Sequence, residues 1–224
     1  MKWNGLPLLI FGSGGISKEV YNLIKDINRI NNQKIYDIIG FVAANKDEIG
    51  NEIIDSYKVV SSDESVIDFV SDYAVIGIVI PIGNPKIKAD IYNKVKALRN
   101  AVFPNIIHPS ILFNEENIEI GIGNIITAGV CLTCNIKIGN FNLINLNSTI
   151  GHDTEIGDFN VVNPLVAISG NVNLKNECLV GTGAQILQGL NISNNSTIGA
   201  GAVVVKDIVE GNTTVVGIPA KPIK

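Results

Sequence analysis

An aliphatic residue recurs at every sixth position from Ile120 to Val204, without one break in phase. A period of six fits neither an α-helix, whose faces recur about every 3.6 residues, nor an independent strand, whose faces alternate. It is typical of a parallel β-helix, in which short strands coil around a core and each coil stacks on the one before. Three such strands make a coil of about 18 residues, so the segment predicts between about four and five coils. The fifteen positions are Ile120, Ile126, Leu132, Ile138, Ile144, Ile150, Ile156, Val162, Ile168, Leu174, Val180, Ile186, Ile192, Ile198 and Val204.

Two neighbouring positions support the β-helix. Small or compact residues stand two positions before many of the aliphatic ones, where a narrow prism needs a filler: Ser148, Thr154, Cys178, Ala184, Ser196 and Ala202. Glycine, asparagine or serine directly follows many of them: Gly121, Gly139, Asn145, Gly151, Gly157, Asn163, Ser169, Gly181 and Gly199. We expect these following positions to be corners, at which glycine or asparagine tolerates a strained backbone.

The first hundred residues instead alternate strand-like and helix-like segments. Residues 8–11 are a continuous apolar run of the kind found in buried parallel strands, and a glycine-rich turn follows them. We expect further strands at residues 38–42, 74–80 and 101–106, and helices at residues 17–30, 64–70 and 86–98. This alternation predicts a parallel sheet with helices around it, and the hexads begin after a boundary near residues 105–110.

The composition limits the class of protein and of partner. The chain is 46% hydrophobic and 17% charged, so it has ample material for a core. No stretch approaches the ~20 uninterrupted apolar residues of a membrane span. The N-terminus lacks the longer apolar segment of a signal peptide, so we expect a cytoplasmic protein with no membrane partner. A net charge of −4 without a basic cluster argues against nucleic acid as a partner.

The cysteines do not predict a metal site. Cys131 and Cys134 have CxxC spacing, but no second pair exists, and His108 and His152 are the only histidines. A structural zinc site would therefore lack ligands. We expect Cys131, Cys134 and Cys178 to be reduced thiols at β-helix positions, with no metal bound.

Several motifs, together with the hexads, resemble one family of enzymes. Leu-Ile-Phe-Gly-Ser-Gly-Gly at residues 9–15, Ile-Ile-His-Pro-Ser at 106–110, Ile-Gly-His-Asp at 150–153 and Val-Gly-Ile-Pro-Ala-Lys at 216–221 look like the hexapeptide-repeat sugar acetyltransferases of the sialic-acid O-acetyltransferase and bacillosamine N-acetyltransferase group. The resemblance covers nearly the whole chain. It implies an α/β, Rossmann-like N-terminal domain (residues 1–106) for a nucleotide sugar. It also implies a left-handed parallel β-helix domain with a C-terminal tail (residues 107–224) for acetyl transfer from acetyl-CoA, and assembly as a homotrimer.

Two glycine-containing loops are candidates for substrate binding. Residues 12–15, Gly-Ser-Gly-Gly, stand between a strand and a helix N-terminus, where free amides favour anions such as phosphate. NAD is disfavoured, because Ser17 occupies the third glycine position of GxGxxG and residues 41–45 at the end of the second strand hold no acid for a ribose. From the residues alone, a tight turn that needs glycine is as good an interpretation as a ligand site. Residues 83–85, Gly-Asn-Pro, form a second loop after a parallel strand.

The resemblance assigns both loops to the nucleotide part of a sugar substrate, with Ser13, Gly14, Gly15 and Gly83 as binding residues. The chain departs from many relatives at four positions. Ile16 stands where they carry a histidine, Ala43 and Ala44 stand where they carry an Asp-Asp pair, and Val161 stands where some carry a second histidine near the cofactor. The base of the nucleotide, its contacts and one coenzyme A contact therefore stay open.

His152 is the candidate base. It follows Gly151 at an expected corner of the β-helix, where its ring can leave the core, and Asp153 beside it can hold the imidazole in one tautomer. From spacing alone, an exposed corner histidine without function is an equal alternative. His108 stands among Ile106, Ile107 and Ile111, which favours a structural role.

The resemblance implies the remaining roles. His152 and Asp153 would be the catalytic pair, with His152 as base, and the backbone amide of Gly170 would face the acetyl carbonyl. Thr182 and Ala200 would line coenzyme A through their backbones. A γ-class carbonic anhydrase shares the β-helix but needs three histidine ligands, and this chain has two histidines.

The resemblance as a whole predicts an acetyl-CoA-dependent N-acetyltransferase. Its substrate would be a nucleotide-linked amino-dideoxy sugar, modified at the C4 amine during bacterial surface glycan synthesis. Two alternatives remain open: O-acetylation of a sialic-acid-like sugar, and a trimeric scaffold that binds a nucleotide sugar without catalysis. A scaffold has no need of a base, so the pair His152 and Asp153 argues against it.

Overall fold

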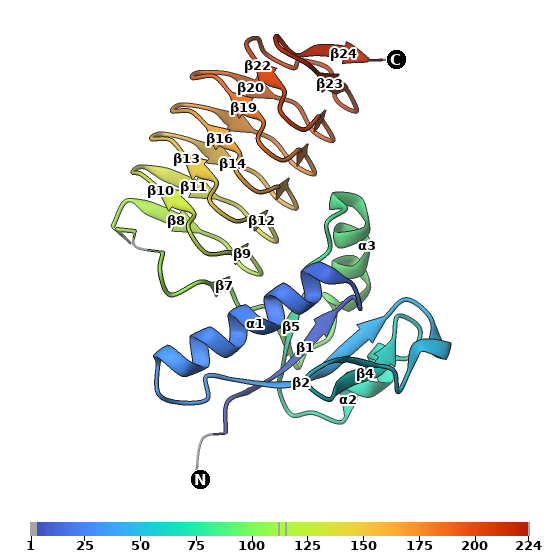
Figure 1. The fold of residues 1–224 in the computed structure, drawn as a ribbon. Helices are drawn as coiled ribbons and strands as arrows, with labels where there is room; N and C mark the ends of the chain where they lie inside the picture. Colours follow the sequence, from blue (N-terminus) through green and yellow to red (C-terminus); the bar gives the residue numbers. More distant parts are fainter. Residues whose placement is uncertain (1–3, 112, 115, 224) are drawn as a thin grey trace. The chain divides into compact units, whose positions relative to one another are not determined.

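A computed structural model describes residues 4–111, 113–114 and 116–223 (Figure 1). The chain forms two compact units. The first comprises the described residues up to Gly83 together with Ile87–Ile106, and the second comprises Asn84–Lys86 and the described residues from Ile107 onward. Among the helices that the structure describes, none has the length and apolarity that a membrane crossing requires.

The first unit is built on a six-stranded sheet of order β3-β4-β2-β1-β5-β6. All neighbours in it pair in parallel except β3 and β4, which are antiparallel. The strands are β1 (Leu6–Phe11), β2 (Tyr36–Ala43), β3 (Glu52–Ile54), β4 (Tyr57–Ser62), β5 (Ile76–Val79) and β6 (Ala101–Val102). The helices are α1 (Gly15–Ile30), η1 (Lys46–Glu48, a 3-10 turn), α2 (Val66–Ser71) and α3 (Pro85–Val95).

This unit confirms the predicted α/β alternation and corrects it in two places. The hairpin of β3 and β4 was missed, because its turn is Asp55-Ser56 and lacks the glycine that marks such turns; both residues nevertheless have left-handed φ angles, of 47° and 69°. The strand expected over residues 101–106 is divided, and β7 (Ile106–Ile107) pairs with the sheets of the β-helix. Pro104 lies between the two pieces and has no N–H for a sheet ladder.

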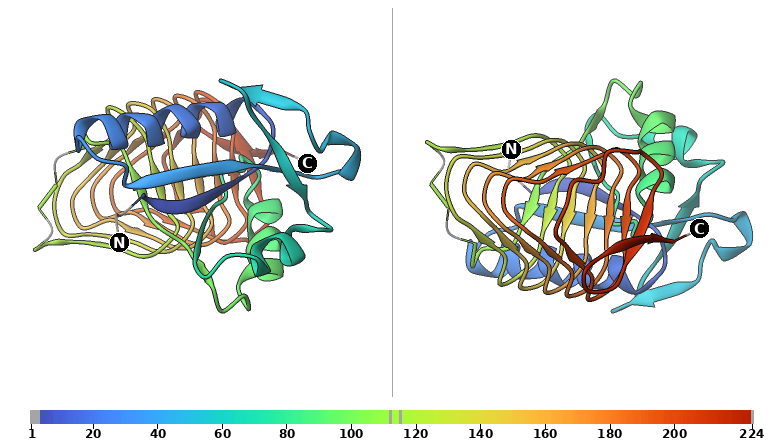
Figure 2. Two further views of the ribbon diagram at one scale, coloured as in Figure 1. Left: turned by 90° about the horizontal axis from the view of Figure 1, so that it is seen from below. Right: turned by 90° about the horizontal axis from the view of Figure 1, so that it is seen from above.

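The second unit is a parallel β-helix of three sheets, which confirms the predicted fold class. One sheet has the order β10-β13-β16-β19-β22, a second β20-β17-β14-β11-β8, and the third β24-β23-β21-β18-β15-β12-β9-β7. Partners in neighbouring coils are 18 residues apart, as in Cys131 with Thr149, and Figure 2 shows the coils one behind another. The strands are β8 (Ile118–Ile120), β9 (Ile125–Ile126), β10 (Cys131–Leu132), β11 (Ile136–Ile138), β12 (Leu143–Ile144), β13 (Thr149–Ile150), β14 (Glu155–Ile156), β15 (Val161–Val162), β16 (Ala167–Ile168), β17 (Asn173–Leu174), β18 (Leu179–Val180), β19 (Gln185–Ile186), β20 (Asn191–Ile192), β21 (Thr197–Ile198), β22 (Val203–Val204), β23 (Thr214–Val216) and β24 (Lys221–Ile223).

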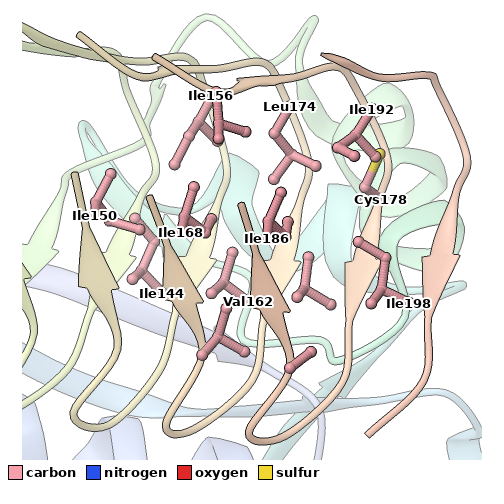
Figure 3. Close-up of a cluster of buried hydrophobic side chains, with 14 of the residues drawn as sticks. Ile144, Ile150, Ile156, Val162, Ile168, Leu174, Cys178, Ile186, Ile192 and Ile198 are labelled. Atoms are coloured by element: carbon pink, nitrogen blue, oxygen red, sulfur yellow. The ribbon is translucent and has the colours of Figure 1, made fainter. Parts of the chain in front are cut away.

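The aliphatic ladder forms the core of the β-helix. Its residues point inward from the ends of the strands (Figure 3), and all are buried except Ile120, which is half-buried. The expected fillers Ser148, Thr154, Cys178, Ala184, Ser196 and Ala202 are fully buried. Of the cysteines, therefore, Cys178 lies in the core, whereas Cys131 and Cys134 are exposed free thiols.

The strained backbone of the corners lies two residues later than expected. Left-handed φ angles occur at the third residue after each aliphatic one except Val204, as at Asn135, Asp153 and Asn171, and not at the first. The glycines at the first position have another cause. A Cβ on Gly151 would collide with Gly170 N in the next coil, so glycine is needed there for the close approach of successive coils.

A ladder of buried asparagines runs through three coils and was not foreseen. Asn124, Asn142 and Asn160 are spaced 18 residues apart, and each is fully buried. Asn142 donates from both its backbone N and its Nδ2 to Asn124 Oδ1, at 2.8 and 3.0 Å, and Asn160 repeats this toward Asn142. Because each side-chain amide is hydrogen-bonded to the asparagine in the next coil, these polar side chains can be buried in an apolar core.

Candidate active site

His152 and Asp153 form a hydrogen-bonded pair on the turn between β13 and β14. The distance from His152 Nδ1 to Asp153 Oδ2 is 2.7 Å. Both side chains are about half exposed, at 52%. The imidazole is therefore neither a core residue nor an isolated corner residue, since it has a carboxylate partner and access to solvent.

The pair has a defined chemistry. An ionised carboxylate is an acceptor only, so Nδ1 of His152 carries the proton and Nε2 of the neutral ring is left as a free base. The hydrogen bond from His152, and next the one from Asn135, lower the pKa of the Asp153 carboxyl below its usual value. Asp153 thus stays charged and fixes the tautomer that a general base requires.

Gly170 in the next coil lies directly beneath the imidazole. A Cβ at this position would lie 2.5 Å from His152 Nε2 and 2.6 Å from Cε1, so only glycine leaves room for the ring. His152 O accepts a 2.7 Å hydrogen bond from Asn171 N, which joins the two coils at the same place. The structure therefore brings together His152, Asp153 and Gly170, as the sequence analysis expected of them.

The predicted cofactor residues share one property: an uncapped backbone amide. At one corner of the coil, side chains cap the amides of the second residue after the ladder, as Asp158 caps Asn140 N at 2.6 Å and Asn176 caps Asp158 N at 2.7 Å. Within the described part of the chain, the N–H groups of Gly170, Thr182 and Ala200 make no hydrogen bond. These amides can donate to a carbonyl or phosphate oxygen of a bound molecule.

Two glycines of the preceding coil keep two of these amides uncovered. A Cβ on Gly151 would collide with Gly170 N, and a Cβ on Gly181 would lie 2.5 Å from Ala200 N. Thr182 and Ala200 belong to the corner after β18 and β21, whereas Gly170 and His152 belong to the corner after β13 and β16. A single chain therefore presents the expected cofactor residues at two different corners.

The loop after β1 contains one glycine that the turn requires and two glycines at which a side chain would fit. Gly12 has a left-handed φ of 92°, and a Cβ there would lie 2.9 Å from Ser17 Oγ, so this glycine serves the turn. At Gly14 and Gly15 a Cβ would meet nothing within 4 Å. These two open glycines begin α1, whose first amides favour an anion.

The second predicted loop lies beside the first. A Cβ on Gly83 would lie 3.1 Å from Cδ1 of Ile16, and the two preceding strands, β5 and β1, pair in parallel. Ser13, Gly14, Gly15 and Gly83 thus gather at the carboxyl ends of adjacent strands, where open α/β sheets bind ligands.

The loop also has an acidic neighbour that the sequence analysis did not find. Ser13 Oγ donates to Glu48 Oε2 at 3.0 Å, and Asn45 Nδ2 donates to Glu48 Oε1 at 3.3 Å. Residues 41–45 hold no acid, but η1 follows them and places Glu48 beside the loop. Its carboxylate can accept hydrogen bonds from the hydroxyl or N–H groups of a nucleoside.

His108 is held in the turn that begins the β-helix. Its backbone N donates to Ile126 O at 2.8 Å, and its Nδ1 accepts from Ser110 N at 3.1 Å. These contacts support the structural role favoured above. Among the described residues, no group of three or more His, Cys, Asp or Glu is placed to hold a metal ion.

Comparison with known proteins shows which proteins this chain is similar to. Residues 7–95 match the sequence family of the PglD N-terminal domain. The N-terminal domain is PglD-like. No curated protein sequence matches the chain.

Solved structures match over nearly the full length. The acetyltransferase domain of PglB from Neisseria gonorrhoeae FA1090, solved with acetyl coenzyme A, is 26% identical with a TM-score of 0.84, covering 98% of this chain and 100% of that one. WeeI from Acinetobacter baumannii AYE is 29% identical with a TM-score of 0.82, covering 97% and 100%. A variant of perosamine N-acetyltransferase from Caulobacter crescentus, in complex with CoA and GDP-perosamine, shares the fold at 23% identity and a TM-score of 0.84, covering 97% of each chain. The resemblance to hexapeptide-repeat sugar acetyltransferases is thereby confirmed.

The departures from the relatives remain visible in the PglD-like domain and in the β-helix. Ala43 is buried in β2 and Ala44 is exposed after it, so neither offers a polar contact to a nucleotide. Val161 in β15 is fully buried and has no polar side-chain atom for a cofactor. The polar residues that the sequence analysis missed, Glu48 and Asn135, lie instead in direct contact with predicted site residues.

Proposed function

We propose that the chain is an acetyl-CoA-dependent N-acetyltransferase that acts on the amine of a nucleotide-linked amino-dideoxy sugar. The observation that carries the proposal is the arrangement of His152 over Gly170: a base with its Nδ1 held by Asp153 and its Nε2 free, beside an uncapped amide. The match to an acetyltransferase domain solved with acetyl coenzyme A supports the choice of donor.

The residues present fit the reaction. Bound acetyl-CoA would supply the acetyl group as a thioester. His152 Nε2 would take the proton of the amine as its nitrogen attacks, and the Gly170 N–H would donate to the carbonyl oxygen as it gains negative charge. The C–S bond to coenzyme A would then break, and the imidazolium would give its proton to the departing thiolate. Asp153 would orient the ring and stabilise the imidazolium that forms. Thr182 and Ala200 offer further amides to the acyl donor.

The substrate proposal rests on the PglD-like domain. Gly14 and Gly15 leave open space at the first amides of α1, which suits a diphosphate, and Gly83 borders the same edge. We propose the C4 amine of the sugar as acceptor, in bacterial surface glycan synthesis. Since such substrates and acetyl-CoA are cytoplasmic metabolites, the enzyme would work in the cytoplasm.

We propose further that the enzyme is a homotrimer. The expected cofactor residues stand at two corners of one chain, so a site that uses both needs two β-helices side by side. Light scattering should give a mass three times the 23.9 kDa of the chain. A stable, active monomer would refute the shared site.

A thiol-release assay tests the function. Purified protein with acetyl-CoA should release free thiol with one or more of a panel of UDP-, GDP- and dTDP-linked 4-amino sugars, and not with their 4-hydroxy counterparts. A preference for a hydroxyl sugar would favour O-acetylation, and binding without thiol release would favour a scaffold. His152→Ala should lower turnover by about 10²–10⁴-fold while both substrates still bind.

A further inference from the structure

The contacts around His152 and Asp153 include a residue that no motif singled out. Asn135 lies 18 residues before Asp153, one coil back, and its Nδ2 donates to Asp153 Oδ1 at 3.1 Å. We propose that Asn135 is a positioning residue for His152: it fixes the Asp153 carboxylate, which in turn fixes the tautomer and orientation of the imidazole. The proposal rests on the proposed function, in which His152 is the base.

The pair is held from the coils on both sides. From the preceding coil, Cys134 O accepts a hydrogen bond from Asp153 N at 3.1 Å, and Asn135 adds its side-chain bond. From the following coil, Asn171 N donates to His152 O at 2.7 Å, and Gly170 makes room for the ring. The backbone of the pair is thus fixed by both neighbouring coils, and in the described part of those coils Asn135 is the residue whose side chain also holds the carboxylate.

The direction of each hydrogen bond follows from the chemistry of the carboxylate. Asp153 is an acceptor, so Asn135 must present its NH₂ group to it and His152 must present Nδ1–H. Each of the two oxygens then has one donor, so rotation of the carboxylate would break both hydrogen bonds. Because Asp153 is half exposed, loss of Asn135 would free the carboxylate to turn toward water and the ring to adopt the other tautomer.

Asp153 brings a carboxylate into direct contact with the imidazole. The neighbours in the flanking coils, Cys134, Asn135, Gly170 and Asn171, add no carboxylate and no basic side chain. The Asn135 donor draws negative charge from Asp153 and so weakens its attraction for a protonated ring. A change at Asn135 should therefore shift the pH dependence of turnover, which a role in folding alone would not do.

A simpler interpretation is that asparagine is present at position 135 because of its backbone conformation. Its φ is 53°, a left-handed angle that asparagine tolerates better than most residues. The test variant is therefore Asn135→Gly, which keeps this angle without strain and removes only the side chain. Asn147→Gly is the matched control, because Asn147 has a φ of 56° at the equivalent position of another corner.

The kinetic test separates these roles. Asn135→Gly should lower kcat by about 10–100-fold, the usual effect of removing a group that orients a histidine, with both KM values changed by less than about threefold. The acid limb of the pH–rate profile should move to higher pH. Asn135→Asp, which sets a second carboxylate beside Asp153, should move it further, by about one unit or more. A kcat within twofold of the parent protein, an unmoved acid limb, or an equal loss in Asn147→Gly would overturn the proposal.

A measurement without substrate keeps this test independent of the proposed function. The chain has two histidines, so ¹⁵N-detected ring spectra of the full chain are simple, and His152→Ala assigns them. The parent protein should show the Nδ1–H tautomer at His152, and Asn135→Gly should show a mixture with Nε2–H. Absence of turnover with every sugar would refute the proposed function alone, whereas identical ring shifts in the two proteins would refute the role of Asn135.

Discussion

Gly170→Ala tests directly where the His152 ring lies, because it adds a methyl group beside that ring. The new methyl carbon would lie 2.5 Å from His152 Nε2, 2.6 Å from Cε1 and 2.9 Å from Cδ2. Non-bonded carbon contacts are optimal near about 3.5 Å, so the ring must retreat by roughly 1 Å. A misplacement of that size costs about 10²-fold in rate at a reacting group. The Gly170 amide is retained, so the predicted loss is due to the ring alone.

The fold should tolerate this change. Gly170 does not have a left-handed φ, and the three atoms nearest to the new methyl group all belong to the His152 side chain, which is half exposed and can swing toward solvent. Alanine restricts the unfolded chain more than glycine, so the melting temperature should stay constant or rise slightly. The expected result is a kcat about 100-fold lower in a protein of unchanged stability, measured by thiol release and by scanning fluorimetry.

The double variant identifies the cause. In His152→Ala the ring atoms nearest to the new methyl group are gone, so adding Gly170→Ala should produce little further loss. If the methyl group instead blocked a substrate, the two losses would multiply. A Gly170→Ala enzyme with parental kcat would refute the placement of the ring.

Three other changes test other parts of the molecule. Gly14→Val fills open space at the start of α1, so KM for the nucleotide sugar should rise about tenfold or more while KM for acetyl-CoA stays constant; an equal rise in both would indicate misfolding. Burial lowers the pKa of the Lys88 ammonium to about 7. The unfolded chain then holds the extra proton between about pH 7 and 10.4, so stability rises with pH across that window. Lys88→Met should flatten this rise, and a curve parallel to that of the parent protein would contradict the assignment. Asn142→Ala breaks the buried asparagine ladder and should lower the free energy of unfolding in urea by about 2–4 kcal/mol. Asn173→Ala, on the outer side of the β-helix, should lower it by less than about 0.5 kcal/mol. Equal losses would show that the ladder contributes little to stability.

The fold of the β-helix could be predicted because its period is short and strict. Each coil repeats the same contacts, so a single rule about every sixth residue assigns strands, core and register together. The N-terminal domain has no such repeat, and its elements were found from local patterns alone. The hairpin of β3 and β4 could not be predicted, because its turn residues Asp55 and Ser56 adopt left-handed φ angles although neither is glycine. No rule based on local composition detects such a turn.

The same repeat explains which site residues could have been found. In a β-helix, residues 18 apart are neighbours, so a candidate pair at 152 and 153 directs attention to 134, 135, 170 and 171. Gly170 was predicted from the resemblance and Asn135 was not predicted, although Gly170 lies 18 residues after His152 and Asn135 lies 18 residues before Asp153. Glu48 is a different case, because its approach to Ser13 depends on how η1 turns the chain after β2, and no period connects the two residues. The candidate residues of the β-helix can therefore be derived by counting from a single histidine, whereas the contacts of the candidate residues in the PglD-like domain require the three-dimensional path of its loops.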